Sequence, residues 1–294
     1  MIPAFLQRPR FEISNLMSTP HFPLLIEPET LALYHDLEDL LVVDVSRAKS
    51  YSIAHIPRAV YIEYADLVLK NPPVGGLLPD IRHLGRLFSS VGLTSTTHVI
   101  AYDDEGGGKA GRLVWILHLL GHDLCSVLNG GIHAWANERH ALERQPNTPS
   151  ASDYRAEIRR PEYLVDAEYV LKNLGNPDVA IVDARTPVEY TGEKKFSARG
   201  GHIPGAVNLD WTSTLDRARN LRWQPKDELR AMFEKIGVSP DREVIVYCQT
   251  HHRSSQLYMV LRYLGYPNVR GYAGSWSEWG NLMGVPVVEG DSPT

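Results

Sequence analysis

The chain has 294 residues, of which 43% are hydrophobic and 22% charged, and its formal net charge is −5 at pH 7. This composition is that of a globular protein with room for two domains, and the negative charge argues against nucleic acid or an anionic membrane as the main partner. No apolar run approaches the length of a membrane span, and two cysteines exclude a disulfide framework.

The N-terminal residues 1–23 contain prolines and arginines but no continuous apolar stretch of the kind found in signal peptides. We expect them to form a poorly ordered tail. A chain with so few cysteines and a single working thiol fits a reduced compartment, so we expect a cytoplasmic location.

Strand and helix patterns alternate along the rest of the chain. Strands are predicted at residues 41–45, 99–102, 124–128, 180–184, 243–247 and 269–272. Helices are predicted at residues 81–91, 113–120, 226–236 and 254–264, where apolar residues recur at helical spacing. This alternation predicts an α/β fold with mainly parallel sheets and helices on both faces of each sheet.

The chain contains an internal duplication. The segment VIAYD at 99–103 aligns with VIVYC at 244–248, and AHIPRAV at 54–60 aligns with GHIPGAV at 201–207. The repeat is too long for a solenoid, so we expect two similar domains, at residues 24–142 and 163–294. The segment 143–162 begins with a polar stretch rich in proline and serine, as expected of a linker.

A cysteine stands where a predicted strand meets a predicted helix, in the segment CQTHHR at 248–253. The N–H groups of a tight loop and the N-terminus of a helix can stabilise a thiolate there, and Arg253 adds a fixed cation for an anionic substrate. Asp103 takes the place of Cys248 in the first copy, which is therefore predicted to be silent. Cys125 lies in an alternating strand pattern and is expected to have no chemistry.

Two features resemble sites of other kinds. The segment EGGGK at 105–109 follows a strand as a phosphate loop would, but its glycine spacing is wrong, so we interpret it as a degenerate copy of the cysteine loop. His251 and His252 suggest a metal site, yet adjacent residues project differently and no further ligand is evident. We therefore expect no metal and no cofactor, and assign both histidines to the pocket wall.

The motifs in combination resemble one family. DARTPVEY at 183–190, GHIPGAVN at 201–208, the cysteine loop and GYAGSW at 271–276 together resemble the rhodanese domain, and the chain resembles a tandem-domain rhodanese over roughly residues 26–288. The loop is similar to that of the Azotobacter-type bacterial rhodanese. It departs from the CRKGVT loop of vertebrate rhodaneses and the CGSGVT loop of mercaptopyruvate sulfurtransferases.

The resemblance implies a thiosulfate sulfurtransferase whose second domain is catalytic. Cys248 would accept sulfur from thiosulfate as a persulfide and pass it to cyanide or a thiol. Glu189 is expected to organise the region around Arg185, and His202 is expected to have a structural role. For Asp183, structural hydrogen bonding and a functional role are equally open. The candidate substrate-binding residues are Arg185, Arg253, Gln249, Thr250, His251, His252, Ser254 and Trp211.

Three alternatives remain open from the sequence. The donor could be mercaptopyruvate, or the protein could be a persulfide carrier that delivers sulfur to a protein partner. A Cdc25-like phosphatase shares this fold, but its loop encloses five residues between cysteine and arginine, whereas Cys248 and Arg253 enclose four. The smaller loop suits a sulfur atom better than a phosphate group. The expected partners are thus a small-molecule sulfur donor and a thiophilic acceptor, with a sulfur-accepting protein as the alternative acceptor, but neither nucleic acid nor a membrane.

Overall fold

The computed structural model describes residues 22–294, so the tail expected at 1–23 lies outside it except for its last two residues. The described chain forms two five-stranded sheets, in each of which all neighbouring strands are parallel. The first has the order β1-β7-β6-β2-β3, with strands Leu25–Ile26, Cys125–Leu128, His98–Tyr102, Leu40–Asp44 and Val60–Tyr61. The second has the equivalent order β8-β14-β13-β9-β10, with strands Leu164–Val165, Val269–Tyr272, Glu243–Tyr247, Val179–Asp183 and Ala206–Asn208.

Helices connect these strands in the same succession in both halves. In the first half they are α1 Pro28–Tyr34, α2 Ala48–Ile53, α3 Ile81–Ser90, α4 Gly108–Leu119 and α5 Gly131–Asn137. In the second half they are α6 Ala167–Lys172, α7 Pro187–Tyr190, α8 Lys226–Lys235, α9 Arg253–Leu264 and α10 Ser275–Trp279. Short 3₁₀ turns complete the chain at η1 Tyr64–Leu67, η2 Pro161–Tyr163, η3 Trp211–Thr214 and η4 Arg217–Arg219. The predicted α/β fold with two similar domains is confirmed.

Alternation along the central strands divides the core into layers. Val99 and Ala101 of β6 face a cluster with α3 and α4, whereas Ile100 and Tyr102 face a second cluster with Leu31 of α1 and Trp135 of α5. The second domain repeats this arrangement. The cluster around α4 continues into that around α9, so one apolar core runs through both domains.

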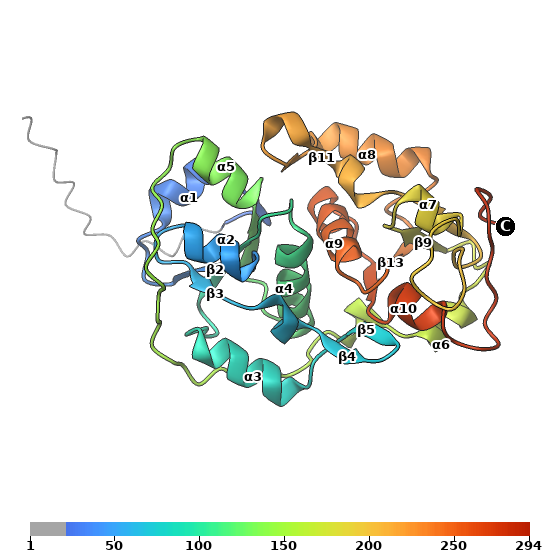
Figure 1. Cartoon of the computed structure of the whole chain (residues 1–294), viewed down its shortest axis with the longest axis horizontal. Helices are drawn as coiled ribbons and strands as arrows, with labels where there is room; N and C mark the ends of the chain where they lie inside the picture. Colours follow the sequence, from blue (N-terminus) through green and yellow to red (C-terminus); the bar gives the residue numbers. More distant parts are fainter. Residues whose placement is uncertain (1–21) are drawn as a thin grey trace, which may run out of the picture.

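The two domains meet along α4 and α9, which lie side by side at the centre of the molecule (Figure 1). These are equivalent helices, and each starts directly after the loop that follows the central strand of its sheet. Gly111 permits the close approach, because a Cβ atom there would lie 2.9 Å from the Ser255 carbonyl oxygen. Each loop is therefore held at the boundary between the domains.

Each domain also extends a hairpin toward the other. The first arm, residues 69–77, comprises β4 Leu69–Asn71 and β5 Val74–Leu77 and approaches α10 of the second domain (Figure 1). The second arm, residues 215–223, comprises β11 Leu215–Asp216 and β12 Arg222–Trp223. Its Leu215 and Trp223 lie against Gly106 and Gly107 of the first domain. Each arm thus lies against the loop that follows the central strand of the other domain.

The linker expected at 143–162 is extended and packs on the first domain. The Ser152 N–H donates to the Ser89 carbonyl at 2.9 Å, and the Arg159 and Arg160 N–H groups donate to the Leu119 carbonyl. The domain limits 24–142 and 163–294 stay predictions, although every sheet strand falls within them. Within residues 22–294 no helix is both long and apolar enough to cross a membrane.

Candidate active site

Cys248 follows β13 directly and is fully buried at the start of the catalytic loop, residues 248–253. Burial alone would raise the pKa of its thiol. The charge of Arg253, the hydroxyl of Ser254 and the backbone N–H groups of Ser254 and Thr250 outweigh burial, so the pKa is lowered. The sulfur is thereby prepared as a nucleophile without an adjacent general base.

The turn between β14 and α10 fixes the backbone of this loop. The Ser275 hydroxyl accepts hydrogen bonds from the backbone N–H groups of Cys248 at 3.3 Å and His251 at 3.0 Å, and donates to the Tyr272 carbonyl. Ser275 has a φ of 51°, where its equivalent in the first domain is Gly131. The sequence analysis did not single out Ser275, although it lies within a motif quoted there.

Arg253 begins α9 and forms a forked ion pair with Glu189 of α7. Its Nη1 and Nη2 atoms donate to the two carboxylate oxygens at 2.7 and 2.8 Å. Burial would raise the pKa of Glu189, but the Arg253 guanidinium and the Thr186 hydroxyl lower it to about 2. The expectation that Glu189 organises the Arg185 region agrees with its hydrogen bonds to Thr186, and its carboxylate also holds Arg253 beside the sulfur.

His251 points into the protein. It is fully buried, its Nδ1 lies 2.8 Å from the Ser254 hydroxyl oxygen, and its ring packs against Trp115 of α4 with centroids 4.5 Å apart. Burial, followed by the charges of Arg112 and His252, holds the pKa of His251 well below 6.5. The expectation that His251 is part of the pocket wall and binds substrate is therefore corrected, because a neutral, enclosed imidazole serves the loop's internal structure.

His252 points toward the first domain and pairs through Nε2 with Glu105. Glu105 belongs to the loop at residues 103–109, which is equivalent to the catalytic loop but lacks the cysteine and is called the silent loop below. Burial lowers the pKa of His252, but the hydrogen bond and charge of Glu105 raise it overall. Burial raises the pKa of Glu105, and the paired His252 and Lys109 lower it overall. Tyr64 and Trp211 flank His252, with ring centroids 5.2 and 6.3 Å away. His252 therefore links the two loops.

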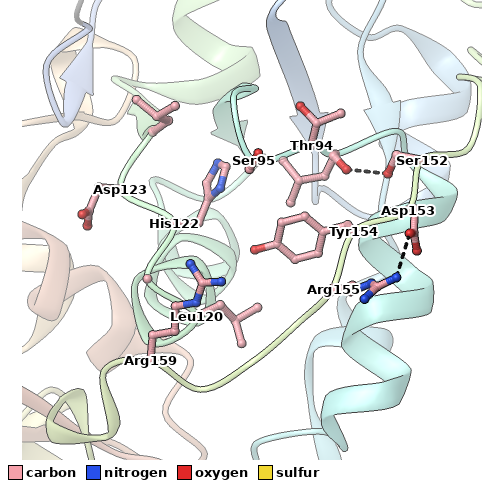
Figure 2. Close-up of a pocket in the computed structure, with 13 residues that line it drawn as sticks. Thr94, Ser95, Leu120, His122, Asp123, Ser152, Asp153, Tyr154, Arg155 and Arg159 are labelled. Carbon is pink, nitrogen blue, oxygen red and sulfur yellow. Dashed lines mark hydrogen bonds and ion pairs between the residues drawn. The ribbon is translucent and has the colours of Figure 1, made fainter.

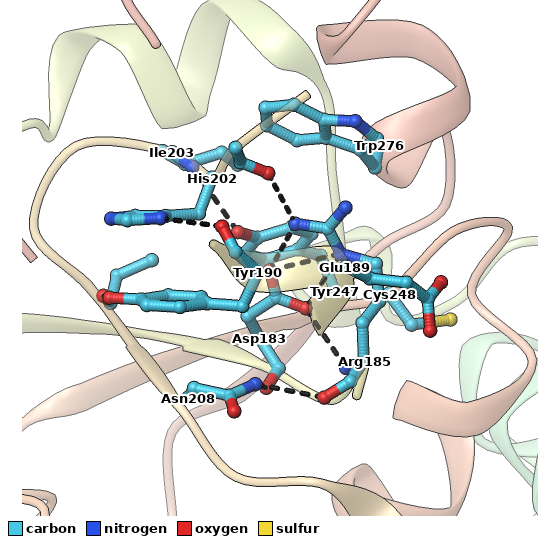
Figure 3. A network of polar contacts seen from close by, with 12 residues as sticks. Asp183, Arg185, Glu189, Tyr190, His202, Ile203, Asn208, Tyr247, Cys248 and Trp276 are labelled. Atoms are coloured by element: carbon cyan, nitrogen blue, oxygen red, sulfur yellow. Dashed lines mark hydrogen bonds and ion pairs between the residues drawn. The ribbon is translucent and has the colours of Figure 1, made fainter. Parts of the chain in front are cut away.

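Arg185 lies behind the catalytic loop rather than at its mouth (Figure 3). Its side chain is 2% exposed, pairs with the Asp183 carboxylate at 2.5–3.0 Å and donates to the Gly201 carbonyl at 2.7 Å. The Trp276 ring covers the guanidinium at 4.5 Å. The expectation of substrate binding by Arg185 is corrected, because its donors are committed to the protein. The structural role expected of His202 agrees with this network, in which His202 stacks on Tyr190 and hydrogen-bonds the Tyr190 carbonyl. For Asp183, which the sequence leaves open between structure and function, the pairing with Arg185 favours structure.

The silent loop of the first domain holds an anion of its own. Asp103, at the position equivalent to Cys248, is 1% exposed. Its two carboxylate oxygens accept hydrogen bonds at 2.9–3.1 Å from five backbone N–H groups, those of Glu105, Gly106, Gly107, Lys109 and Ala110. The glycine-rich segment is therefore a cradle filled by the chain's own carboxylate, as its interpretation as a degenerate copy requires.

An open hollow of about 630 Å³ lies against the catalytic loop, and both domains contribute to it; we call it the mouth, although the buried Cys248 is not itself on its lining. Gln249, Thr250 and Arg253 line it from the catalytic loop, as expected of binding residues. Trp211 is only partly buried near His252 and is not among the lining residues. The lining residues that the sequence analysis missed are Pro73, Gly75, Thr186, Lys194, Phe196 and Ser277. Pro73 and Gly75 belong to the first arm, whose approach leaves no periodic signal in the sequence.

A second hollow, of about 550 Å³, lies in the first domain between the linker and the end of α4 (Figure 2). It is lined by Tyr154 and Arg159 of the linker and by His122, whose carbonyl accepts from the Cys125 thiol at 3.4 Å. Burial raises the pKa of Cys125 far above its usual value, as expected of a cysteine without chemistry. Among residues 22–294, no three His, Cys, Asp or Glu side chains gather as a metal site.

Comparison with known proteins gives consistent matches. The family model for the rhodanese-like domain matches residues 27–138 and 166–282. The chain is 42% identical over 265 residues to the thiosulfate sulfurtransferase of Azotobacter vinelandii, covering 90% of this chain and 97% of that protein. It is 33% identical to the sulfur carrier protein TtuD of Thermus thermophilus, covering 82% and 87%. Among solved structures, SseA from Escherichia coli, described under 3-mercaptopyruvate sulfotransferases, matches with a TM-score of 0.77 and 28% identity, covering 87% of this chain and 99% of that one.

Proposed function

The chain belongs to the rhodanese family, and on that basis we propose that it is a thiosulfate sulfurtransferase that carries sulfur on Cys248. The observation that carries the proposal is the pair of equivalent loops. One encloses the Asp103 carboxylate in a ring of N–H donors, and the other places a cysteine of lowered pKa at the same point. A loop built to hold an anion there suits a thiolate that becomes a persulfide.

Sulfur transfer at this site proceeds in two steps. The Cys248 thiolate attacks the outer sulfur of thiosulfate, the S–S bond of thiosulfate breaks, and sulfite leaves with the electron pair. Cyanide or a thiolate then attacks the outer sulfur of the persulfide, releasing thiocyanate or a new persulfide and regenerating the Cys248 thiolate. The negative charge stays near one point throughout, so loop N–H groups and Arg253 can stabilise every state.

The donor is assigned from charge. Thiosulfate carries two negative charges on a compact body. Arg253 lines the mouth, and its guanidinium charge also acts on the Cys248 thiol. Lys194 is a second cation on the lining. Mercaptopyruvate has one carboxylate, and it is the competing donor. We expect a higher kcat/KM for thiosulfate, and steady-state kinetics with both donors decides between them.

The acceptor is a small thiophile, and a sulfur-accepting protein is a second candidate. The mouth is wide and open, and Phe196 on its rim is 59% exposed, which suits a surface larger than cyanide. The relative named as a sulfur carrier favours the same role. We also propose a cytoplasmic location, because Cys125 and Cys248 are both unpaired and the chemistry needs a free thiol.

Mass spectrometry of the purified protein tests the proposal. Cyanide treatment should leave a bare Cys248, and thiosulfate should then add one sulfur atom to it with release of one sulfite per chain. A second addition of cyanide should yield thiocyanate. Thiocyanate production without a sulfur adduct on Cys248 would contradict the persulfide mechanism.

A further inference from the structure

The first domain places an arginine behind the catalytic loop of the second. Arg112 of α4 is fully buried, and its guanidinium lies 4.5 Å from the Trp115 ring. Its Nε donates to the Leu67 carbonyl, and its Nη2 donates to the Gly76 and Leu77 carbonyls, both at 3.0 Å. Arg112 therefore holds the first arm by hydrogen bonds to its backbone, and this arm forms part of the mouth.

Arg112 has no carboxylate partner within the described part of the chain. Its buried Nη1 has no hydrogen-bond partner within residues 22–294 either. Burial lowers the pKa of Arg112 to about 10, against the opposing influence of Tyr64 and Cys248, so it stays cationic at neutral pH. Buried charges in proteins are usually paired, and the Cys248 thiolate is an anion whose charge acts on it.

The equivalent position in the second domain shows what an uncharged side chain does at this place. The position equivalent to Arg112 on α9 is Gln256, which is also fully buried. Its Nε2 donates to the Thr214 hydroxyl at 2.8 Å, at the base of the second arm. A neutral amide thus suffices to hold the arm over the silent loop. The arm over the cysteine is held by a cation, so holding an arm does not explain the charge.

A contiguous line of contacts joins Arg112 to the sulfur. Its guanidinium lies over Trp115, and Trp115 packs edge-on against His251 with centroids 4.5 Å apart. His251 Nδ1 lies 2.8 Å from the Ser254 hydroxyl oxygen. With a neutral imidazole donating from Nδ1, the Ser254 hydroxyl keeps its own proton to donate to the sulfur, a contact that contributes to the lowered pKa of Cys248.

We propose that Arg112, from the domain without the cysteine, is a positioning residue of sulfur transfer that supplies a second buried positive charge behind the catalytic loop for the Cys248 anion. The role of that anion as sulfur acceptor rests on the proposed function. Arg253 remains the stronger influence on the thiol, since it begins the adjacent helix. The other ionisable groups that face this region are Glu189 of α7, the pair of Asp183 and Arg185 after β9, His251 and His252 of the catalytic loop, Asp103 and Glu105 of the first domain's loop, and Tyr64 of η1.

The test compares Arg112→Gln, which copies the equivalent position, with Arg112→Lys, which keeps the charge. Cys248 is first freed of sulfur with cyanide, and its rate of alkylation by iodoacetamide is then followed against pH by mass spectrometry. We expect the midpoint of Arg112→Gln to rise by about one pH unit, and its alkylation below that midpoint to slow about tenfold. Arg112→Lys should keep a midpoint near that of the native protein.

Gln256→Met is the matched control, because it disturbs the hold on the second arm without changing a charge. Its midpoint should equal that of the native protein. A folded Arg112→Gln protein with an unmoved midpoint would overturn the proposal, and circular dichroism establishes its folding. If Arg112→Gln does not fold, Arg112→Lys decides: a midpoint raised by about one unit despite the retained charge would equally overturn it. Alkylation needs no sulfur donor, so failure here is distinct from failure of the thiosulfate assignment.

Discussion

Cys248 and Cys125 are both buried after or within central strands, yet their surroundings differ. Cys248 faces N–H groups, a hydroxyl and Arg253, whereas the Cys125 thiol lies in the apolar core and donates to the His122 carbonyl. The sequence distinguished the two from their positions alone, since one stood at a strand–helix junction. It also predicted stabilisation of the thiolate by loop N–H groups, but it could not show that Ser275 holds the loop backbone or that Glu189 holds Arg253, because both residues are remote in the chain.

We predict that iodoacetamide modifies Cys248 at neutral pH and leaves Cys125 unmodified in the folded protein. The pKa of Cys248 is lowered, so its thiolate is present above the lowered value and is lost as pH falls through it. The pKa of Cys125 is raised. Peptide mapping after alkylation measures both. Cys248→Ala should abolish sulfur transfer, whereas Cys125→Ala should leave it intact; modification of Cys125 first would contradict this contrast.

Substitutions of the two arginines should affect different properties, with Arg253→Ala lowering activity and Arg185→Ala lowering stability. Arg253→Ala removes the cation beside the sulfur, and we expect it to weaken kcat/KM for thiosulfate by about 1–3 kcal/mol. Arg185→Ala leaves Asp183 buried without its partner, and we expect a loss of about 3–5 kcal/mol in the free energy of unfolding. Steady-state kinetics and urea denaturation measure the two effects. An Arg185→Ala protein of native stability but poor thiosulfate turnover would restore the substrate role first expected of this residue.

At the scale of elements, the sequence predicted where the central strands and long helices begin and end, to within about one helical turn for the helices. It could do so because the burial of their side chains repeats at a regular period. The predicted helix at 113–120 missed the first turn of α4, Gly108–Arg112, where glycines obscure the helical pattern. The two arms were missed entirely. Their strands are two to four residues long, and their packing partners lie in the other domain.

The loops predict an absence of phosphatase activity. Asp103 and Lys109 enclose five residues, and that longer loop surrounds a carboxylate with both of its oxygens bonded. The catalytic loop is one residue shorter. We expect no useful hydrolysis of p-nitrophenyl phosphate and poor inhibition by vanadate. Hydrolysis that disappears in Cys248→Ser would show that the size argument is wrong.

The first arm should be sensitive to a single methyl group. A Cβ at Gly76 would collide with the backbone carbonyl of Thr250, whereas one at Gly75 would meet only the Thr250 methyl at 3.1 Å. We expect Gly76→Ala to cost about 1–3 kcal/mol in the free energy of unfolding and to raise the KM for thiosulfate. Gly75→Ala is the matched control, with a smaller effect on both. Equal effects of the two substitutions would contradict the proposed seating of the arm.

At the scale of the molecule, the pair between His252 and Glu105 joins the domains across their loops. The sequence analysis singled out both residues but assigned them other roles. It placed His252 in the pocket wall and Glu105 in a segment that resembles a phosphate loop. Their meeting depends on how the two domains pack, which no local pattern encodes. The same holds for Arg112, whose importance follows from the loop of the other domain.

This pair predicts a pH-dependent contribution to stability. The pKa of His252 is raised, so its share is complete below about pH 6.5, the unfolded value, and is lost as pH rises through the folded value. The pKa of Glu105 is lowered, so its share is complete above about pH 4.3 and is lost as pH falls through the folded value. Glu105→Gln should therefore lower the Tm most between these limits and least at alkaline pH. Thermal unfolding across pH measures this, and a uniform change in Tm would contradict it.

The exchange of arms has a consequence for how the protein is made. During synthesis the first domain leaves the ribosome before the second exists, and N-terminal domains generally fold first. Its Asp103 loop can close at once around its own carboxylate, but its arm must wait for Thr250 and Ser277, which are translated much later. The nascent chain thus carries a first domain whose α4 still lacks its partner α9 and whose hairpin is held only from its own side, by Arg112. The sulfur-handling pocket comes into being only when the last portion of the polypeptide arrives beneath that hairpin.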